Sequence, residues 1–141
     1  MTVNNFIRAV AVKLGELYPD RLVYTDEIPA VADGNFFVRC IEQQHEKRLD
    51  RRRRRFYSFE ILYFQRERDT MLFNDWAEKM YSNFERLACE GRLFHLTNAH
   101  AENGDDGVFH FVFDADFTAL LAPDPVAFME TLEMREDVKN G

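Results

Sequence analysis

Five consecutive arginines, residues 51–55, lead directly into a run of aromatic and aliphatic residues that ends at Phe64. Every second residue of this run is apolar, and a period of two residues is typical of a β-strand. These apolar positions are Tyr57, Phe59, Ile61 and Tyr63. Five arginines cannot be buried without partners. We therefore expect one long strand over 51–64 whose arginine end projects past the core of the domain.

The arginine run stands in an acidic chain. The formal net charge is −7, from 18 basic and 25 acidic side chains. Residues 47–55 hold seven basic side chains and one acid, a local charge of +6, which leaves −13 on the remainder. A protein that coats nucleic acid would be basic over a whole face. The pattern instead favours contact with an acidic partner, and a second copy of this chain is one candidate.

The length and composition predict one globular domain. A chain of 141 residues, of which 46% are hydrophobic, can bury a sizeable core. We place this domain at 1–122, because Pro123 and Pro125 interrupt the pattern, and a C-terminal segment or arm at 123–141. Residues 126–134 fit either a short helix or an extended arm. The sequence contains no run of apolar residues long enough to cross a membrane and no signal peptide at its start.

Periodicity predicts the remaining elements. Apolar residues at three- and four-residue spacing indicate helices over 2–17 and 70–89, the second ended by Gly91. The predicted extended segments are 22–25, 35–42, 51–64, 93–102 and 108–117, with a polar connection over 43–50 and a turn over 103–107. The expected fold class is α+β, a small mainly antiparallel or mixed sheet of four to five strands flanked by two helices, in the order α-β-β-β-α-β-β.

The sequence offers little for catalysis, and we expect neither an enzyme nor a cofactor. Cys40 and Cys89 lie in different predicted elements and are best explained as buried, reduced thiols. If Glu102 pairs with Val108 across the closing hairpin, His100 and His110 face each other. That pair would begin a metal site, with Glu102 or Asp114 as further ligands. Two half-exposed histidines of a sheet explain the pattern better, because too many ligands are unspecified.

Nucleic-acid binding is the alternative function. Arg51–Arg55 would pair with phosphates, and Tyr57 and Phe59 would stack on bases. The acidic remainder would repel a duplex everywhere except at the basic end. Residues 102–141 contain ten acids and two basic residues, so a basic hairpin tip and an acidic C-terminal third are able to pair between copies. A solubilising acidic surface explains the same acids equally well.

Several short segments resemble the tail terminator proteins of long-tailed phages and of phage-like elements of Gram-positive bacteria. The helix that contains Trp76 and Leu87 and the closing hairpin follow in the family's order. The matching segments are residues 18–29 (YPDRLVYTDEIP), 35–39 (NFFVR), 59–64 (FEILYF) and 129–133 (METLE). The resemblance covers most of the chain, and the arginine run is where it departs from the family pattern.

The resemblance implies a structural virion protein without catalytic activity. Such a protein forms a ring, typically of six subunits, on the last ring of the tail tube. It stops tube polymerisation and provides the surface that joins the head connector. The implied partners are further copies of the chain, the tail tube protein and the head–tail connector protein. DNA only passes through the lumen, no membrane is involved, and assembly takes place in the cytoplasm of the bacterial host.

The arginine-rich hairpin is the expected contact surface of this ring. We expect the hairpin over residues 47–56 to touch a neighbouring subunit or the tail tube. The residues predicted to make this contact are Arg51, Arg52, Arg53, Arg54 and Arg55.

Overall fold

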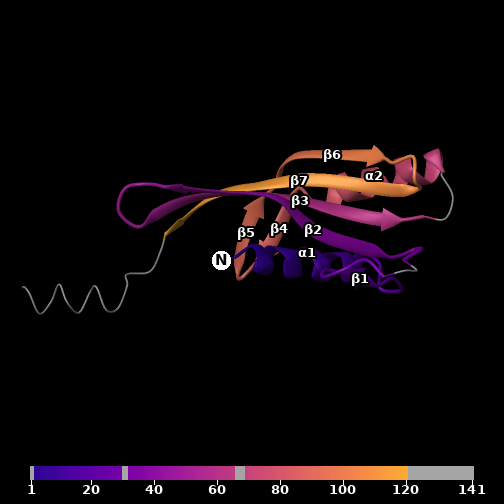
Figure 1. The fold of residues 1–141 in the computed structure, drawn as a ribbon, viewed down its shortest axis with the longest axis horizontal. Helices are drawn as coiled ribbons and strands as arrows, with labels where there is room; N and C mark the ends of the chain where they lie inside the picture. Colours follow the sequence, from indigo (N-terminus) through magenta and orange to yellow (C-terminus); the bar gives the residue numbers. More distant parts are fainter. Residues whose placement is uncertain (1, 30–31, 66–68, 121–141) are drawn as a thin grey trace, which may run out of the picture.

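The computed structural model describes residues 2–29, 32–65 and 69–120, and it confirms the α+β class (Figure 1). The helices are α1 (Val3–Leu17) and α2 (Thr70–Asn83). The strands are β1 (Val23–Tyr24), β2 (Phe36–Lys47), β3 (Arg52–Phe64), β4 (Arg86–Cys89), β5 (Arg92–His95), β6 (Thr97–Asn103) and β7 (Val108–Leu120). Neither helix of the described part is long and apolar enough to cross a membrane.

Five strands form one mixed sheet in the order β1-β2-β3-β7-β6. The short β1 runs parallel to β2, and the other neighbours are antiparallel. The long strand that the arginine run enters, β3, is therefore the central strand. Strands β4 and β5 form a separate two-stranded hairpin.

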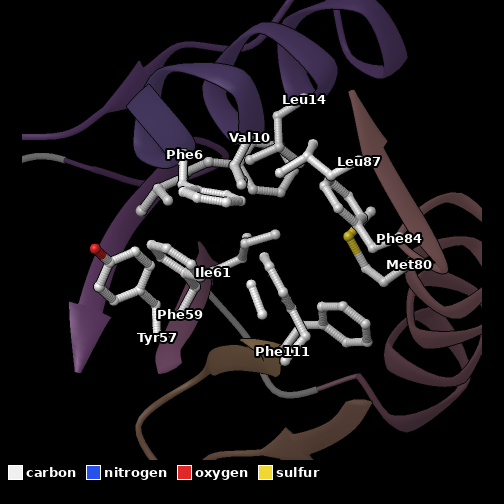
Figure 2. Close-up of a cluster of buried hydrophobic side chains, with 14 of the residues drawn as sticks. Phe6, Val10, Leu14, Tyr57, Phe59, Ile61, Met80, Phe84, Leu87 and Phe111 are labelled. Carbon is white, nitrogen blue, oxygen red and sulfur yellow. The ribbon is translucent and has the colours of Figure 1, made fainter. Parts of the chain in front are cut away.

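Both helices pack on one side of the sheet around an aromatic core (Figure 2). Helix α1 begins at Thr2, whose hydroxyl accepts a hydrogen bond from the backbone of Asn5 in a capping box. The ring of Phe6 lies completely buried. It contacts the rings of Tyr57, Phe59, Phe94 and Phe117. Each such buried side chain stabilises the fold by about 1.5–3 kcal/mol relative to an exposed one.

The second helix is shorter than the sequence predicts. It ends at Asn83 instead of Cys89, and the chain then forms the β4–β5 hairpin. Leu87 and Cys89 are buried because they alternate on a strand, which a helical stripe resembles over so few residues. Gly91 does not cap a helix. Glu90 and Gly91 both have positive φ, 51° and 76°, the signs that a two-residue hairpin turn requires.

The polar connection predicted over 43–50 is also mostly strand, because β2 continues to Lys47. The segment predicted as one strand over 93–102 is divided between β5 and β6. In the closing hairpin, Glu102 lies opposite His110 and not opposite Val108. The turn is tighter than expected, since the backbone N–H of Gly104 already bonds to the carbonyl of Val108, and Gly107 takes a φ of 81°. The alternatives for 126–134 and the C-terminal segment 123–141 lie outside the described residues.

Candidate functional site: the projecting arm

A three-stranded arm extends beyond the core of the domain (Figure 1). We define the arm as residues 43–57 of β2, β3 and their turn, together with residues 115–120 of β7. Gln43 pairs with Tyr57, and Arg52 pairs with Leu120, so the three strands stay in register along the arm. Strand β6 begins opposite Asp114 and stops short of the arm. The prediction that the arginine end of the strand projects past the core is confirmed.

The tip of the arm is a short turn between β2 and β3. The backbone N–H of Arg48 bonds to the carbonyl of Arg52 at 3.1 Å, which closes the turn. Asp50 takes a φ of 62°, a conformation that aspartate tolerates better than most residues. Leu49 is 79% exposed and Leu120 is 68% exposed. The tip therefore presents apolar side chains among cations instead of burying them.

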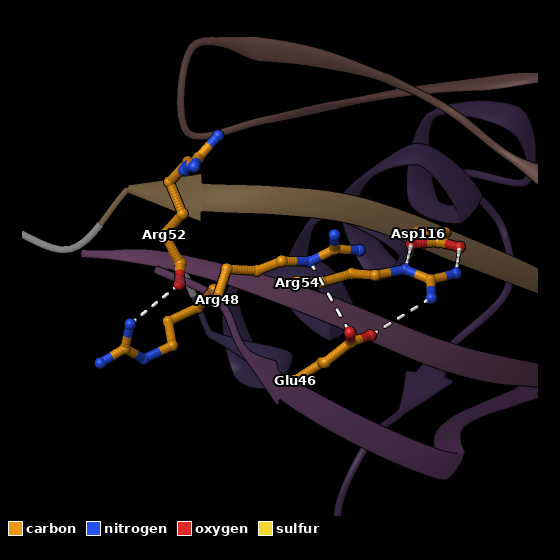
Figure 3. A network of polar contacts seen from close by, with 6 residues as sticks. Glu46, Arg48, Arg52, Arg54 and Asp116 are labelled. Atoms are coloured by element: carbon orange, nitrogen blue, oxygen red, sulfur yellow. Dashed lines mark hydrogen bonds and ion pairs between the residues drawn. The ribbon is translucent and has the colours of Figure 1, made fainter. Parts of the chain in front are cut away.

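Arg54 contacts carboxylates on the two strands that flank its own (Figure 3). Its guanidinium holds Asp116 of β7 with two hydrogen bonds, of 3.0 Å and 2.6 Å. It also reaches Glu46 of β2 at 3.4 Å. The hydrogen bond from Arg54 lowers the pKa of Asp116, and the same contact raises the pKa of Arg54. Arg54 thus joins all three strands of the arm.

The five arginines do not form one patch. Arg53 turns back and donates to the carbonyl oxygens of Asp50 and Arg52. Arg55 lines a hollow of about 320 Å³ at the base of the arm, beside Tyr57 and the start of α1. Of the five arginines, Arg51 and Arg52 are exposed, whereas the other three are partly buried. Alternation along a strand separates neighbouring side chains onto opposite faces, so an unbroken run of one residue type does not act as a unit.

Asp116 changes the interpretation of the acidic C-terminal third. The sequence suggests that these acids meet the arginines between copies, whereas Asp116 pairs with Arg54 within one chain. The acids beyond Leu120 lie outside the described residues. Asp116 and Glu46 are therefore part of the arm's own framework.

The sheet face opposite the helices carries a second polar network. Glu60 is only 8% exposed and accepts hydrogen bonds from Arg39 at 2.8 Å and 2.6 Å. The Nδ1 atom of His110 lies 3.1 Å from Oε2 of Glu60, the carboxylate oxygen that Arg39 does not contact. Asn98 donates to the nearly buried Asp114 at 2.9 Å. This network was not predicted from the sequence, although the polar residues Ser58 and Glu60 inside the aromatic strand were the available signal.

The expected histidine pair is not formed. His100 lies opposite Val112, and His110 faces Glu102 and contacts Glu60. Within the described ranges no three His, Cys, Asp or Glu side chains gather in a way that would hold a metal ion. Neither Cys40 nor Cys89 forms a disulfide, and the first is half-buried and the second buried. Burial raises the pKa of both thiols, which disfavours the reactive thiolate.

Comparison with protein families gives a match to the phage tail terminator family model over residues 5–127. The match spans both the aromatic body and the arm. The chain belongs to the phage tail terminator family. The resemblance expected from residues 18–29, 35–39 and 59–64 is thereby confirmed. This tail terminator is a structural protein of the virion tail, and its family is a family of structural proteins rather than of enzymes.

Other comparisons add little to the family assignment. No curated protein matches the terminator sequence. One solved structure, of a protein that carries only a sequence identifier as its name, is similar with a TM-score of 0.44 and 12% sequence identity. The similarity covers 88% of the terminator and 99% of the solved chain. A likeness this distant assigns no function.

Proposed function

We propose that this terminator forms a ring on the end of the tail tube, stops tube polymerisation and provides the surface to which the head connector binds. The observation that carries the proposal is the family match over residues 5–127, which includes both the body and the arm. A projecting arm with exposed cations and leucines is the kind of element that a subunit offers to a neighbour. The acidic remainder of the chain is compatible with DNA that passes through a lumen without being held.

We further propose that the ring has six subunits and that Arg51–Arg55 supply contacts to a neighbouring subunit or to the tail tube. The five arginines take different parts in this proposal. Arg53 and Arg54 support the shape of the arm through their contacts within the chain. Arg51 and Arg52 remain exposed for intermolecular contact.

The test is negative-stain electron microscopy of growing tail tubes with and without the terminator. A gold-labelled terminator should sit at one end of each tube as a ring, and tubes should stop lengthening when it is added. Tubes that grow to the same length and carry no label at their ends would refute the proposal. A terminator that is monomeric in isolation would not contradict the proposal, because the proposal requires a ring only on the end of the tube.

A further inference from the structure

Strand β1 lies at the end of the molecule opposite the arm (Figure 1), and it lines a hollow there together with the loop that follows it. This hollow has a volume of about 460 Å³, and we call it the β1 hollow. It is lined by residues of β1 and of the loop that follows: Val23, Tyr24, Thr25, Asp26 and Glu27. Leu22 and Ile28 flank these residues in the sequence and are 59% and 47% exposed. The surface is thus acidic with an apolar border.

The charges of the two ends have opposite signs. Residues 47–52 at the arm tip contain four basic side chains and one acid, a net charge of +3. Residues 20–29 around the β1 hollow contain three acids and one arginine, a net charge of −2. Asp26 and Glu27 are exposed, as are Arg51 and Arg52. Complementary potentials of this kind steer association and fix the relative placement of two surfaces.

The apolar side chains of the two ends match as well. Large hydrophobic residues are exposed at both ends, Leu49 and Leu120 at the tip and Leu22 and Ile28 beside the hollow. Apolar residues ringed by charges mark a protein partner more than a polyanion, because a phosphate backbone offers nothing to bury a leucine. A cationic tip with leucines therefore fits an acidic surface with leucine and isoleucine.

We propose that the arm tip of one terminator docks in the β1 hollow of the next copy, with Arg51 and Arg52 facing Asp26 and Glu27. This inference rests on the proposed ring. A contact between two different surfaces is head-to-tail, and it closes into a ring when the rotation between copies permits. Each copy then makes two such contacts, one with its tip and one with its hollow.

The size of the contact explains how such a ring would behave. The tip is small compared with the roughly 800 Å² that each partner buries in a standard interface. A single contact is therefore weak, and a closed ring gains from making all its contacts together. Assembly should weaken as salt is raised, since the facing charges are exposed.

A charge-swap experiment tests the proposal. The tip variant is Arg51→Glu with Arg52→Glu, the hollow variant is Asp26→Lys with Glu27→Lys, and the swap combines all four changes and restores the net charge of −7. Assembly is measured by sedimentation velocity after nuclease treatment, both free and on tail tubes. Each half variant should weaken assembly by on the order of tenfold or more, and the swap should recover most of it.

A matched control reverses two exposed cations elsewhere, with Arg8→Glu on α1 and Arg86→Glu on β4. It should assemble better than the tip variant although it carries the same net charge. Circular dichroism and the thermal midpoint of every variant should equal those of the unmodified chain, because the altered side chains are exposed.

The outcomes separate this inference from the proposed function. If the unmodified chain forms no ring, either free or on tubes, both fail. If rings form and the half variants assemble normally, or if the swap does not rescue them, the docking is overturned while the ring stands. Loss of assembly on nuclease treatment would identify a nucleic acid as the occupant of the tip. Normal rings that no longer bind tubes would identify the tail tube instead.

Discussion

The body and the arm of this terminator are built from the same three strands but are held together by different physical means. In the body, the aromatic side chains of β3 face the helices, and Phe59 is completely buried against Phe6 of α1. In the arm, residues 43–47 are all exposed. The strands there are joined by the backbone hydrogen bonds between them and by the side chain of Arg54. Burial therefore stabilises the body and the base of the arm, where Tyr57 and Phe117 belong to the core, whereas pairing and charge maintain the outer part of the arm.

Because of this difference, we expect changes in the body to affect the stability of the fold and changes at the arm tip to affect assembly. A change in the aromatic body should unfold the protein, since a buried ring contacts many neighbours. A change at the arm tip should leave the fold intact, because residues 47–52 are exposed. Function that depends on the arm is thus open to alteration without loss of the fold.

The largest expected effect comes from the body. Phe59→Ala removes a ring that packs against Phe6 and Phe113, and it should lower the free energy of unfolding by about 3–5 kcal/mol. Denaturant titration followed by circular dichroism measures this loss. Leu49→Ala at the arm tip is the control and should change the free energy by less than about 0.5 kcal/mol. Equal losses in the two variants would break the distinction between body and arm.

The second-largest loss of stability should come from the polar face of the body. Glu60→Gln keeps the shape of the side chain but removes the charge that Arg39 and His110 share. We expect a loss of about 1–3 kcal/mol, because nearly buried polar groups lose their ionic partner. Glu42→Gln, on the exposed part of β2, should be close to neutral when both are compared by thermal unfolding. A neutral Glu60→Gln would show that this network contributes only specificity.

The third prediction concerns the ion pair of the arm, whose loss in acid should loosen the arm without unfolding the body. Because Arg54 lowers the pKa of Asp116, the pair stabilises the arm above the ordinary carboxyl pKa of 3.8. This contribution is lost as the pH falls through the lowered pKa, when Asp116 becomes protonated. The protection factors of residues 52–57, which correct for the slower intrinsic exchange in acid, should fall at pH values below this pKa, and they should already be low at neutral pH in Asp116→Asn. Unchanged protection in that variant would mean that the backbone hydrogen bonds between the strands alone keep the arm ordered.

The smallest effect at neutral pH is expected at Tyr18. Burial, with a smaller effect from Tyr63, raises the pKa of Tyr18 to about 12 from an ordinary value of 10.0. Between these values the unfolded chain loses the phenolic proton while the folded chain keeps it, so stability falls as the pH rises from about 10. Tyr18→Phe should match the unmodified chain at neutral pH and show a shallower decline of the thermal midpoint in alkali. An identical decline would assign the alkaline loss to other groups.

The sequence predicts the body better than the arm for a physical reason. Strand β3 is evident from its alternating Tyr57, Phe59 and Ile61, because one face is buried against helices. The outer half of β2 is exposed on both faces, so Gln43 and Gln44 show no alternation, and its strand is specified only by pairing with β3. Helical and strand periods also coincide at Leu87, which hides the β4–β5 hairpin.

The site was only partly predictable. The projection of the arginine run follows from charge, but the pairing of Arg54 with Asp116 depends on the register of β3 against β7. The contact of Glu60 with His110 depends on the same register, between residues 50 positions apart. Sequence spacing gives no access to such a register, because α2 and three further strands separate β3 from β7 along the chain.

Hydrogen–deuterium exchange of the terminator, free and assembled on tail tubes, tests the division between body and arm most directly. Residues 59–63 of β3 should be protected in both states, because their side chains are buried. Residues 47–52 should exchange rapidly in the free chain and become protected on assembly. Rapid exchange of residues 47–52 in both states, with new protection confined to the body, would contradict the assignment of the arm to assembly.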